Sequence, residues 1–222
     1  MAFTMTHLII SENISELYKS QIENLSQFYL GSIAPDAAHQ RANYISDYKK
    51  ASHLITGDDV WGMITDYDGW QKNIIAFLNE NKHSEHHDFI LGYCCHVLGD
   101  LYNTINVWDP FKLKYAYDLK EVNYGNIHHQ ESNKVDIELA LTYGGRTKFW
   151  FHLSNSYSID LPNIIYSTEI EKQKDLILNS WYKDKERQNI STNKIRTYDG
   201  EMDFIKNASD FVTLIFKENL FC

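Results

Sequence analysis

The chain is poor in residues that break regular structure, with 3 prolines and 10 glycines in 222 residues. Many-stranded β architectures need frequent turns, and turns are built largely from these two residue types. Cysteine is also scarce: of 3 residues, Cys94 and Cys95 are adjacent and Cys222 is last, so no disulfide framework is indicated. No apolar run reaches the roughly 20 residues that cross a bilayer. These absences favour an all-α protein without a transmembrane segment.

Positive charge is in deficit as well, with 21 Lys and Arg against 30 Asp and Glu and a formal net charge of -9. An acidic surface disfavours broad contact with nucleic acid or anionic membranes, so no nucleic-acid partner is expected. A phosphate substrate stays compatible with it, because a bound metal reverses the local charge. The first residues lack the basic region and cleavage pattern of a signal peptide. We therefore expect a cytoplasmic protein, and the sequence leaves its oligomeric state open.

Hydrophobic residues make up 43% of the chain, and their spacing predicts helices along most of it. The expected helices cover residues 6–30 in two or three pieces, 70–81, 89–101 capped by Asp88, 107–117, 131–153, 167–185 capped by Ser167, and 201–220. The alternating apolar residues of 131–153 also fit a strand, and helix is the preferred interpretation. Residues 37–69 are expected to be mostly irregular. We predict one helical domain over residues 1–222, folded as a multi-helix bundle.

The most informative stretch runs from His96 to Asp100, inside an apolar segment that predicts a buried helix. Four residues of spacing place the imidazole and the carboxylate on one helix face, about one turn apart. Burying both groups without partners would be costly. A divalent metal would satisfy both together.

Three further donors lie in mainly apolar contexts: His7 in Thr-His-Leu, Asp36 in Ala-Pro-Asp-Ala and His53 in Ser-His-Leu. Each one alone is more often a hydrogen-bonded histidine or a turn residue. As a set with His96 and Asp100, three imidazoles and two carboxylates suit zinc, or manganese or iron. Five donors exceed one tetrahedral site, and two metals sharing a bridging carboxylate would use them all.

The order and context of these donors resemble the zinc-dependent phospholipase C family and, more distantly, the single-strand-specific zinc nucleases. The motifs that carry the resemblance lie within residues 5–106: His7, Gly31-Ser32-Ile33-Ala34-Pro35-Asp36, Ser52-His53 and Gly92-Tyr93-x-x-His96-x-x-x-Asp100. The resemblance implies an all-α bundle of that type. Its metal-site core would span about residues 5–117, and residues 118–222 carry no recognisable motif. It also implies that Asp36, His53, His96 and Asp100 surround one zinc, and that Asp100 bridges to a second metal held by His7.

The chain departs from the family pattern at its other metal ligands. Asn106 stands where a further His is expected, and Glu121, beside Lys120, is a loose match to the expected Glu. His128 and His129 are alternatives, although paired histidines of this kind are more often solvated. The free amino terminus that holds the second metal in the phospholipases is missing or replaced, since six residues precede the first histidine. The resemblance therefore implies one or two zinc ions per chain.

The implied chemistry is hydrolysis of a small phosphoester or phospholipid-like substrate, with a phosphodiester favoured. Asp36 is the expected general base, and the resemblance equally permits it to be a ligand alone. Two alternatives stay open. One is a helical metal phosphohydrolase of the HD type, for which His87-Asp88 is the candidate pair. The other is a catalytically impaired metal-binding protein of the same fold, which Asn106 and the missing amino-terminal ligand favour.

Neighbouring residues are assigned lesser roles. His39 is a candidate for contact with the metal site or the substrate, and Asn103 is a candidate for orienting a ligand or binding a phosphate oxygen. Core positions are expected for Tyr93 and the two adjacent cysteines, and a structural role for His152. Solvent exposure is expected for the histidines at 83, 86 and 87.

Overall fold

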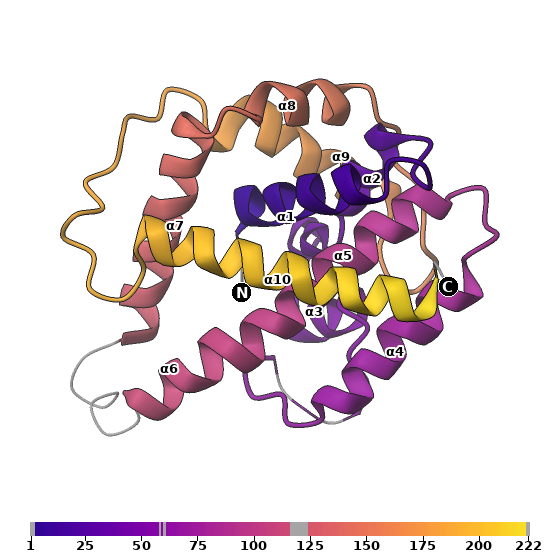
Figure 1. Cartoon of the computed structure of the whole chain (residues 1–222), viewed down its shortest axis with the longest axis horizontal. Helices are drawn as coiled ribbons and strands as arrows, with labels where there is room; N and C mark the ends of the chain where they lie inside the picture. Colours follow the sequence, from indigo (N-terminus) through magenta and orange to yellow (C-terminus); the bar gives the residue numbers. More distant parts are fainter. Residues whose placement is uncertain (1–2, 58, 60, 116–123, 221–222) are drawn as a thin grey trace.

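The structure, a computed structural model, describes residues 3–57, 59, 61–115 and 124–220. Over these ranges it is helical and forms no β-strand, which confirms the all-α prediction. The elements, shown in Figure 1, are α1 Thr4–Leu17, α2 Leu25–Gly31, η1 Pro35–Gln40, α3 Ser46–Ser52, α4 Tyr67–Glu80, α5 His87–Asn103, η2 Thr104–Trp108, α6 Asp109–Lys114, α7 Tyr124–Thr142, α8 Arg146–Ser154, α9 Ser167–Leu176, η3 Ile177–Trp181 and α10 Tyr198–Asn219. Within the same ranges, no helix is long and apolar enough to pass through a bilayer.

Helix α5 forms the centre of the molecule, and every residue from Phe89 to Leu101 is buried. A helix that is apolar on all sides belongs in a protein core. It packs against α1, α2, α4 and α10, and Figure 1 shows α10 running across it. The prediction of a buried helix is therefore confirmed. Asp88 does not cap it, because the side chain lies in its first turn and accepts the backbone N–H of Asn24 at 2.6 Å.

Helices α2 and α5 cross in direct backbone contact at two glycines. A Cβ atom on Gly92 would lie 1.9 Å from the carbonyl oxygen of Phe28, and one on Gly31 would lie 2.0 Å from that of Phe89. Such distances are far below van der Waals contact, so only glycine fits at either position. The close approach brings the end of α2 beside the middle of α5, where His96 is located.

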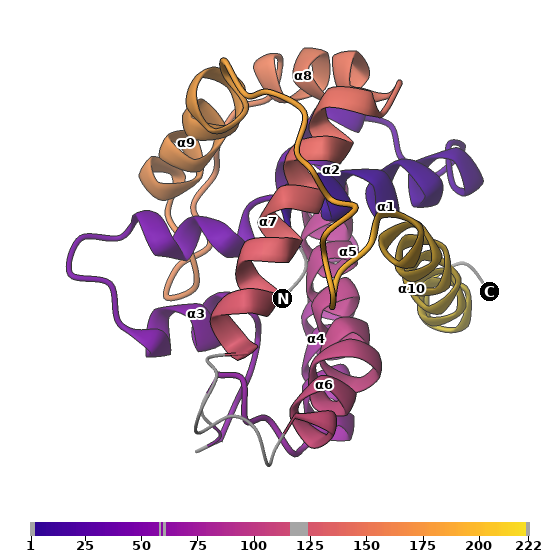
Figure 2. The ribbon, with the colours of Figure 1, turned by 90° about the vertical axis from the view of Figure 1, so that its left-hand side faces the viewer.

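The remaining helices surround this pair. Helix α1 is buried along most of its length and packs against α5, α7 and α10. Helix α8 packs on α2, and α9 packs on η1. Helix α7 also packs against α10, and Figure 2 shows α8 and α9 together at one end of the molecule. The amino-terminal helix is thus enclosed by elements from the second half of the chain.

Several predicted boundaries are wrong, for local reasons. Residues 37–69 include most of η1, all of α3 and the start of α4; η1 and α3 are short helices that are held by tertiary contacts rather than by an apolar repeat. Ala34, which precedes η1 as its N-cap, has helical backbone angles although a proline follows it. The helix from Ser167 is capped by Tyr166, whose N–H donates to the Glu169 carboxylate at 3.0 Å. It continues as a π-helical turn and ends at Trp181, not at 185.

Candidate metal centre

The structure brings all five predicted donors together. His7 comes from α1, Asp36 from η1, His53 directly follows α3, and His96 and Asp100 lie one turn apart on α5. The three histidines and Asp100 are at most 1% exposed, and Asp36 is the most accessible at 16%. Two overlapping triads are able to hold a metal ion: His7, His96 and Asp100, and Asp36, His53 and His96.

The Asp100 carboxylate lies at the middle of the cluster. Its Oδ1 is 3.4 Å from Nε2 of His7, and its Oδ2 is 3.3 Å from Nε2 of His53 and 3.9 Å from Nε2 of His96. The Asp36 carboxylate lies 3.6 Å from Nε2 of His53 and 4.0 Å from Nε2 of His96. The rings of His7 and His96 stack with their centroids 3.6 Å apart. Both carboxylates therefore face imidazole nitrogens across one small volume.

Two of the imidazoles are oriented by backbone carbonyl groups. His96 Nδ1 lies 2.8 Å from the carbonyl oxygen of Ser32, and His53 Nδ1 lies 3.0 Å from that of Lys49. A carbonyl oxygen only accepts hydrogen bonds, so Nδ1 of each ring donates the proton. The lone pair of each neutral ring is then on Nε2, which faces the cluster. Metal-binding histidines are commonly oriented in this way.

Unsatisfied polar atoms support a metal at this place. Nε2 of His7, His53 and His96 is fully buried in each ring, and none of the three makes a hydrogen bond to any residue that the structure describes. Buried polar groups without hydrogen bonds are rare and costly, so three in one cluster need an explanation. Three imidazole nitrogens and two carboxylates form a donor set that zinc accepts. The residues present therefore fit a divalent metal.

The electrostatics of the cluster favour the protonation states that bind metal. Burial lowers the pKa of His96 to about 3, helped by the neighbouring His7 ring, and burial also lowers the pKa of His53. Burial raises the pKa of Asp36, but Lys49 and the imidazoles outweigh it and hold that pKa well below its usual range. Burial also raises the pKa of Asp100, but the rings of His53 and His7 outweigh it and hold that pKa well below its usual range. At neutral pH both carboxyl groups are ionised, and the rings of His53 and His96 are neutral.

Lys49 is a member of the site that the sequence did not indicate. Its side chain is 1% exposed, and its Nζ lies 2.8 Å from Oδ1 of Asp36 and 3.3 Å from Nε2 of His39. The same Nζ lies 4.5 Å from the ring centroid of Trp61, whose ring also packs edge-on against His53. One sequence feature could have pointed to it: Lys49 stands four residues before His53, which is about one helical turn.

The segment that carries His53 is fastened from two sides. Trp70 Nε1 donates to the carbonyl oxygen of His53 at 2.6 Å, and the Tyr93 hydroxyl donates to that of Ser52. Tyr93 is buried as predicted and also has this positioning contact. Aromatic residues of α4 and α5 thus fix an imidazole that lies outside any long helix.

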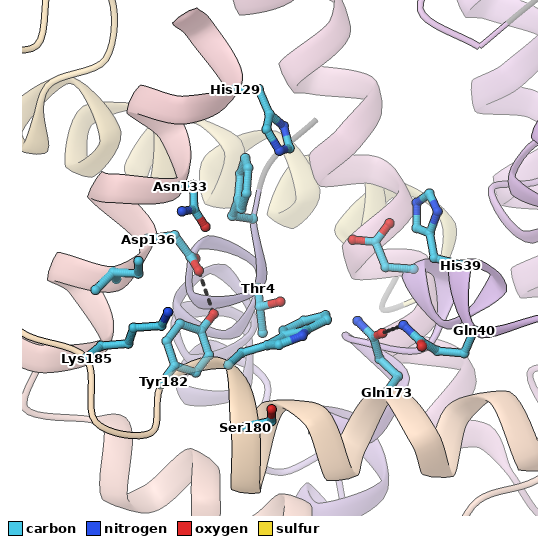
Figure 3. Close-up of a pocket in the computed structure, with 14 residues that line it drawn as sticks. Thr4, His39, Gln40, His129, Asn133, Asp136, Gln173, Ser180, Tyr182 and Lys185 are labelled. Atoms are coloured by element: carbon cyan, nitrogen blue, oxygen red, sulfur yellow. Dashed lines mark hydrogen bonds between the residues drawn. The ribbon is translucent and has the colours of Figure 1, made fainter. Parts of the chain in front are cut away.

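A cavity of about 560 Å³ opens beside the cluster, and Asp36 and His39 form part of its wall. Figure 3 shows His39 and Gln40 on one side of this cavity, with Asn133, Asp136 and Tyr182 across from them. Since Asp36 is the most exposed of the five donors, it is the point at which the cluster meets the cavity. A substrate bound in the cavity would therefore approach the centre at this carboxylate.

The further candidates from the sequence lie elsewhere. Asn106 is exposed and donates to the carbonyl oxygen of Tyr102, whereas the histidines and Asp100 of the cluster are buried. Glu121 lies outside the described residues. His128 is buried against Trp108 and Phe111, contrary to the expectation that it is solvated, whereas its neighbour at 129 is exposed.

The structure also shows where other residues singled out from the sequence lie. The side chain of Asn103 is buried, and its amide makes no hydrogen bond to any described residue. The pair His87-Asp88 lies in the first turn of α5 and belongs to neither triad. His152 has a structural contact, with Nδ1 3.1 Å from the hydroxyl of Ser26.

Comparisons with known proteins found no match, whether to protein-family models, to curated proteins or to solved structures.

Proposed function

We propose that this protein is a zinc-dependent hydrolase of phosphoesters, with phosphodiesters favoured, and a divergent member of the zinc-dependent phospholipase C type. The observation that supports the proposal is the convergence of His7, Asp36, His53, His96 and Asp100 in one buried cluster. The order of these donors along the chain is the order in which that family arranges its ligands. The all-helical fold is compatible with the same type.

The five donors would hold zinc. When bound, it supplies Lewis acidity, which neutralises phosphoryl oxygens and makes water a nucleophile near neutral pH. The cavity beside Asp36 admits the phosphoester, and the buried imidazoles keep bulk water from the far side of the centre. Hydrolysis adds water across the phosphorus–oxygen bond: the water oxygen joins phosphorus, and the alcohol leaves with a proton.

We assign to Asp36 the role of general base, which takes a proton from the attacking water. Its carboxylate is ionised and lines the cavity, so it can accept a proton from water beside it. The low pKa that Lys49 gives it makes it a weak base and a good ligand. An Asp36→Asn variant separates the roles: retained zinc with about 10²–10⁴-fold lower kcat indicates a base, and lost zinc indicates a ligand.

The test is zinc content together with activity. Protein purified without chelator should contain at least one zinc per chain and hydrolyse bis(p-nitrophenyl) phosphate faster than p-nitrophenyl phosphate. His96→Ala should remove both zinc and activity, because His96 belongs to both triads. His83→Ala, at an exposed histidine, is the matched control and should retain both. Zinc without activity toward any phosphoester would support the impaired metal-binding alternative, and a stable zinc-free protein would contradict the proposal.

A further inference from the structure

The candidate metal centre contains a cation of its own, the ammonium group of Lys49. Nζ of Lys49 is buried between Oδ1 of Asp36 and Nε2 of His39, above the ring of Trp61. Taking an ammonium out of water is costly unless a carboxylate compensates it. The pairing with Asp36 provides that compensation, and it places a positive charge directly on one of the five donors.

The two metal-binding triads are not independent, because both need His96. Nδ1 of His96 faces the carbonyl oxygen of Ser32, so Nε2 alone has a lone pair to offer. One lone pair binds one ion. If His7, His96 and Oδ1 of Asp100 hold that ion, a second ion has, among the five donors, Asp36, His53 and at most the other oxygen of Asp100, which lies 3.3 Å from Nε2 of His53.

The formal charges of the cluster also favour one ion over two. The carboxylates of Asp36 and Asp100 contribute two negative charges, and Lys49 contributes one positive charge. One divalent ion brings the formal charge of the cluster to +1, and a second brings it to +3. Like charges repel strongly in a buried, weakly polarisable site. Asp36, one of the donors left for a second ion, is also the carboxylate that Nζ of Lys49 already contacts.

We propose that the centre holds one divalent ion, and that Lys49 supplies to Asp36 the positive charge that a second ion would otherwise bring. Lys49 is then a positioning residue that sets the number of metal ions. This inference rests on the metal-binding part of the proposed function and not on the hydrolysis.

The experiment is a titration with Co²⁺, followed by visible d–d absorption and by calorimetry. The wild-type chain should saturate at one equivalent. Lys49→Gln keeps a hydrogen-bond donor near Asp36 but removes the charge, and it should bind a second equivalent at least about tenfold more tightly than the wild type. Lys49→Arg keeps the charge and should behave as the wild type. Lys174→Gln is the matched control, because Lys174 is also buried and paired, with Glu171.

The outcomes separate this inference from the proposed function. Two equivalents of similar affinity in the wild type would overturn the single-ion centre and leave the metal site intact. Second-ion binding as weak in Lys49→Gln as in the wild type would overturn the role of Lys49. Absence of Co²⁺ binding by the wild type would overturn the metal site itself. Circular dichroism monitors folding; if Lys49→Gln does not fold, Lys49→Met is the second uncharged variant, and the wild-type stoichiometry still tests the single-ion centre.

Discussion

His96 Nδ1 lies 2.8 Å from the carbonyl oxygen of Ser32, a residue 64 positions earlier in the chain. This contact exists because α2 and α5 touch at Gly31 and Gly92. It fixes the proton on Nδ1 and directs Nε2 toward the carboxylates of the cluster. A helix crossing in the core therefore determines the orientation of a side chain at the candidate metal centre.

Gly92→Ala should test this link between packing and the site. The added methyl group would meet the carbonyl oxygen of Phe28, so the helices must separate, at a cost of about 1–3 kcal/mol or more in unfolding free energy. Zinc affinity should fall as well, because the His96 ring moves with α5. Urea unfolding and zinc titration measure the two effects. Gly144→Ala, where nothing lies within 4 Å of the new Cβ, should change stability by less than about 0.5 kcal/mol. Equal effects from both variants would refute the packing argument.

Asp136 should make stability depend on pH. Its carboxyl accepts the N–H of Met5 at 2.8 Å and the hydroxyl of Tyr182, and burial raises its pKa to about 7 in spite of these donors. The unfolded value is about 3.9. Between these two pKa values, the Asp136 carboxyl is protonated more in the folded state than in the unfolded state. Its contribution to the free energy of unfolding is therefore lost as the pH rises from about 4 to about 7.

Asp136→Asn should remove that contribution. Compared with the wild type, the variant should lose less stability between pH 5 and pH 8 when urea unfolding is measured with chelator present. Chelator keeps metal near His7 from altering the titration. Parallel pH profiles for the two proteins would show that Asp136 does not carry the dependence.

The two adjacent cysteines should be inert in the folded protein. Burial raises the pKa of Cys95 to about 12 and raises that of Cys94 further. The thiolate is the reactive form, so iodoacetamide should modify neither residue at pH 8 until urea unfolds the chain. Peptide mass spectrometry measures the extent of modification. Alkylation that appears when a chelator is added to the native protein would instead indicate that the thiols bind metal.

The sequence allowed the prediction of those parts of the site that depend on local spacing. His96 and Asp100 are one turn apart in a strongly apolar helix, and this pattern determined both their burial and their shared face. Grouping them with His7, Asp36 and His53 depended on the order of the donors along the chain, which resembles that of the zinc-dependent phospholipases C. No periodic pattern in the sequence relates donors that lie on separate helices. The structure places these five side chains in one cluster.

The rest depended on tertiary contacts that no local pattern encodes. Lys49 lies in a short polar helix, and lysine is almost never fully buried unless it is paired, so its burial did not follow from the local sequence pattern. Asp88 has the sequence context of a cap, yet its partner is Asn24, from a distant segment. Asn106 lies in a π-helical turn after α5, which changes the direction of its side chain relative to a continuous helix.

The most direct test of the metal centre is X-ray absorption at the zinc edge of the zinc-loaded protein. Three imidazoles and two carboxylates predict a first shell of nitrogen and oxygen only, at about 2.0–2.2 Å, with the outer scattering typical of histidine. His96→Ala should lose the zinc in dialysis. Sulfur scattering at about 2.3 Å, or a first shell without imidazole, would contradict the assignment of the ion to these residues.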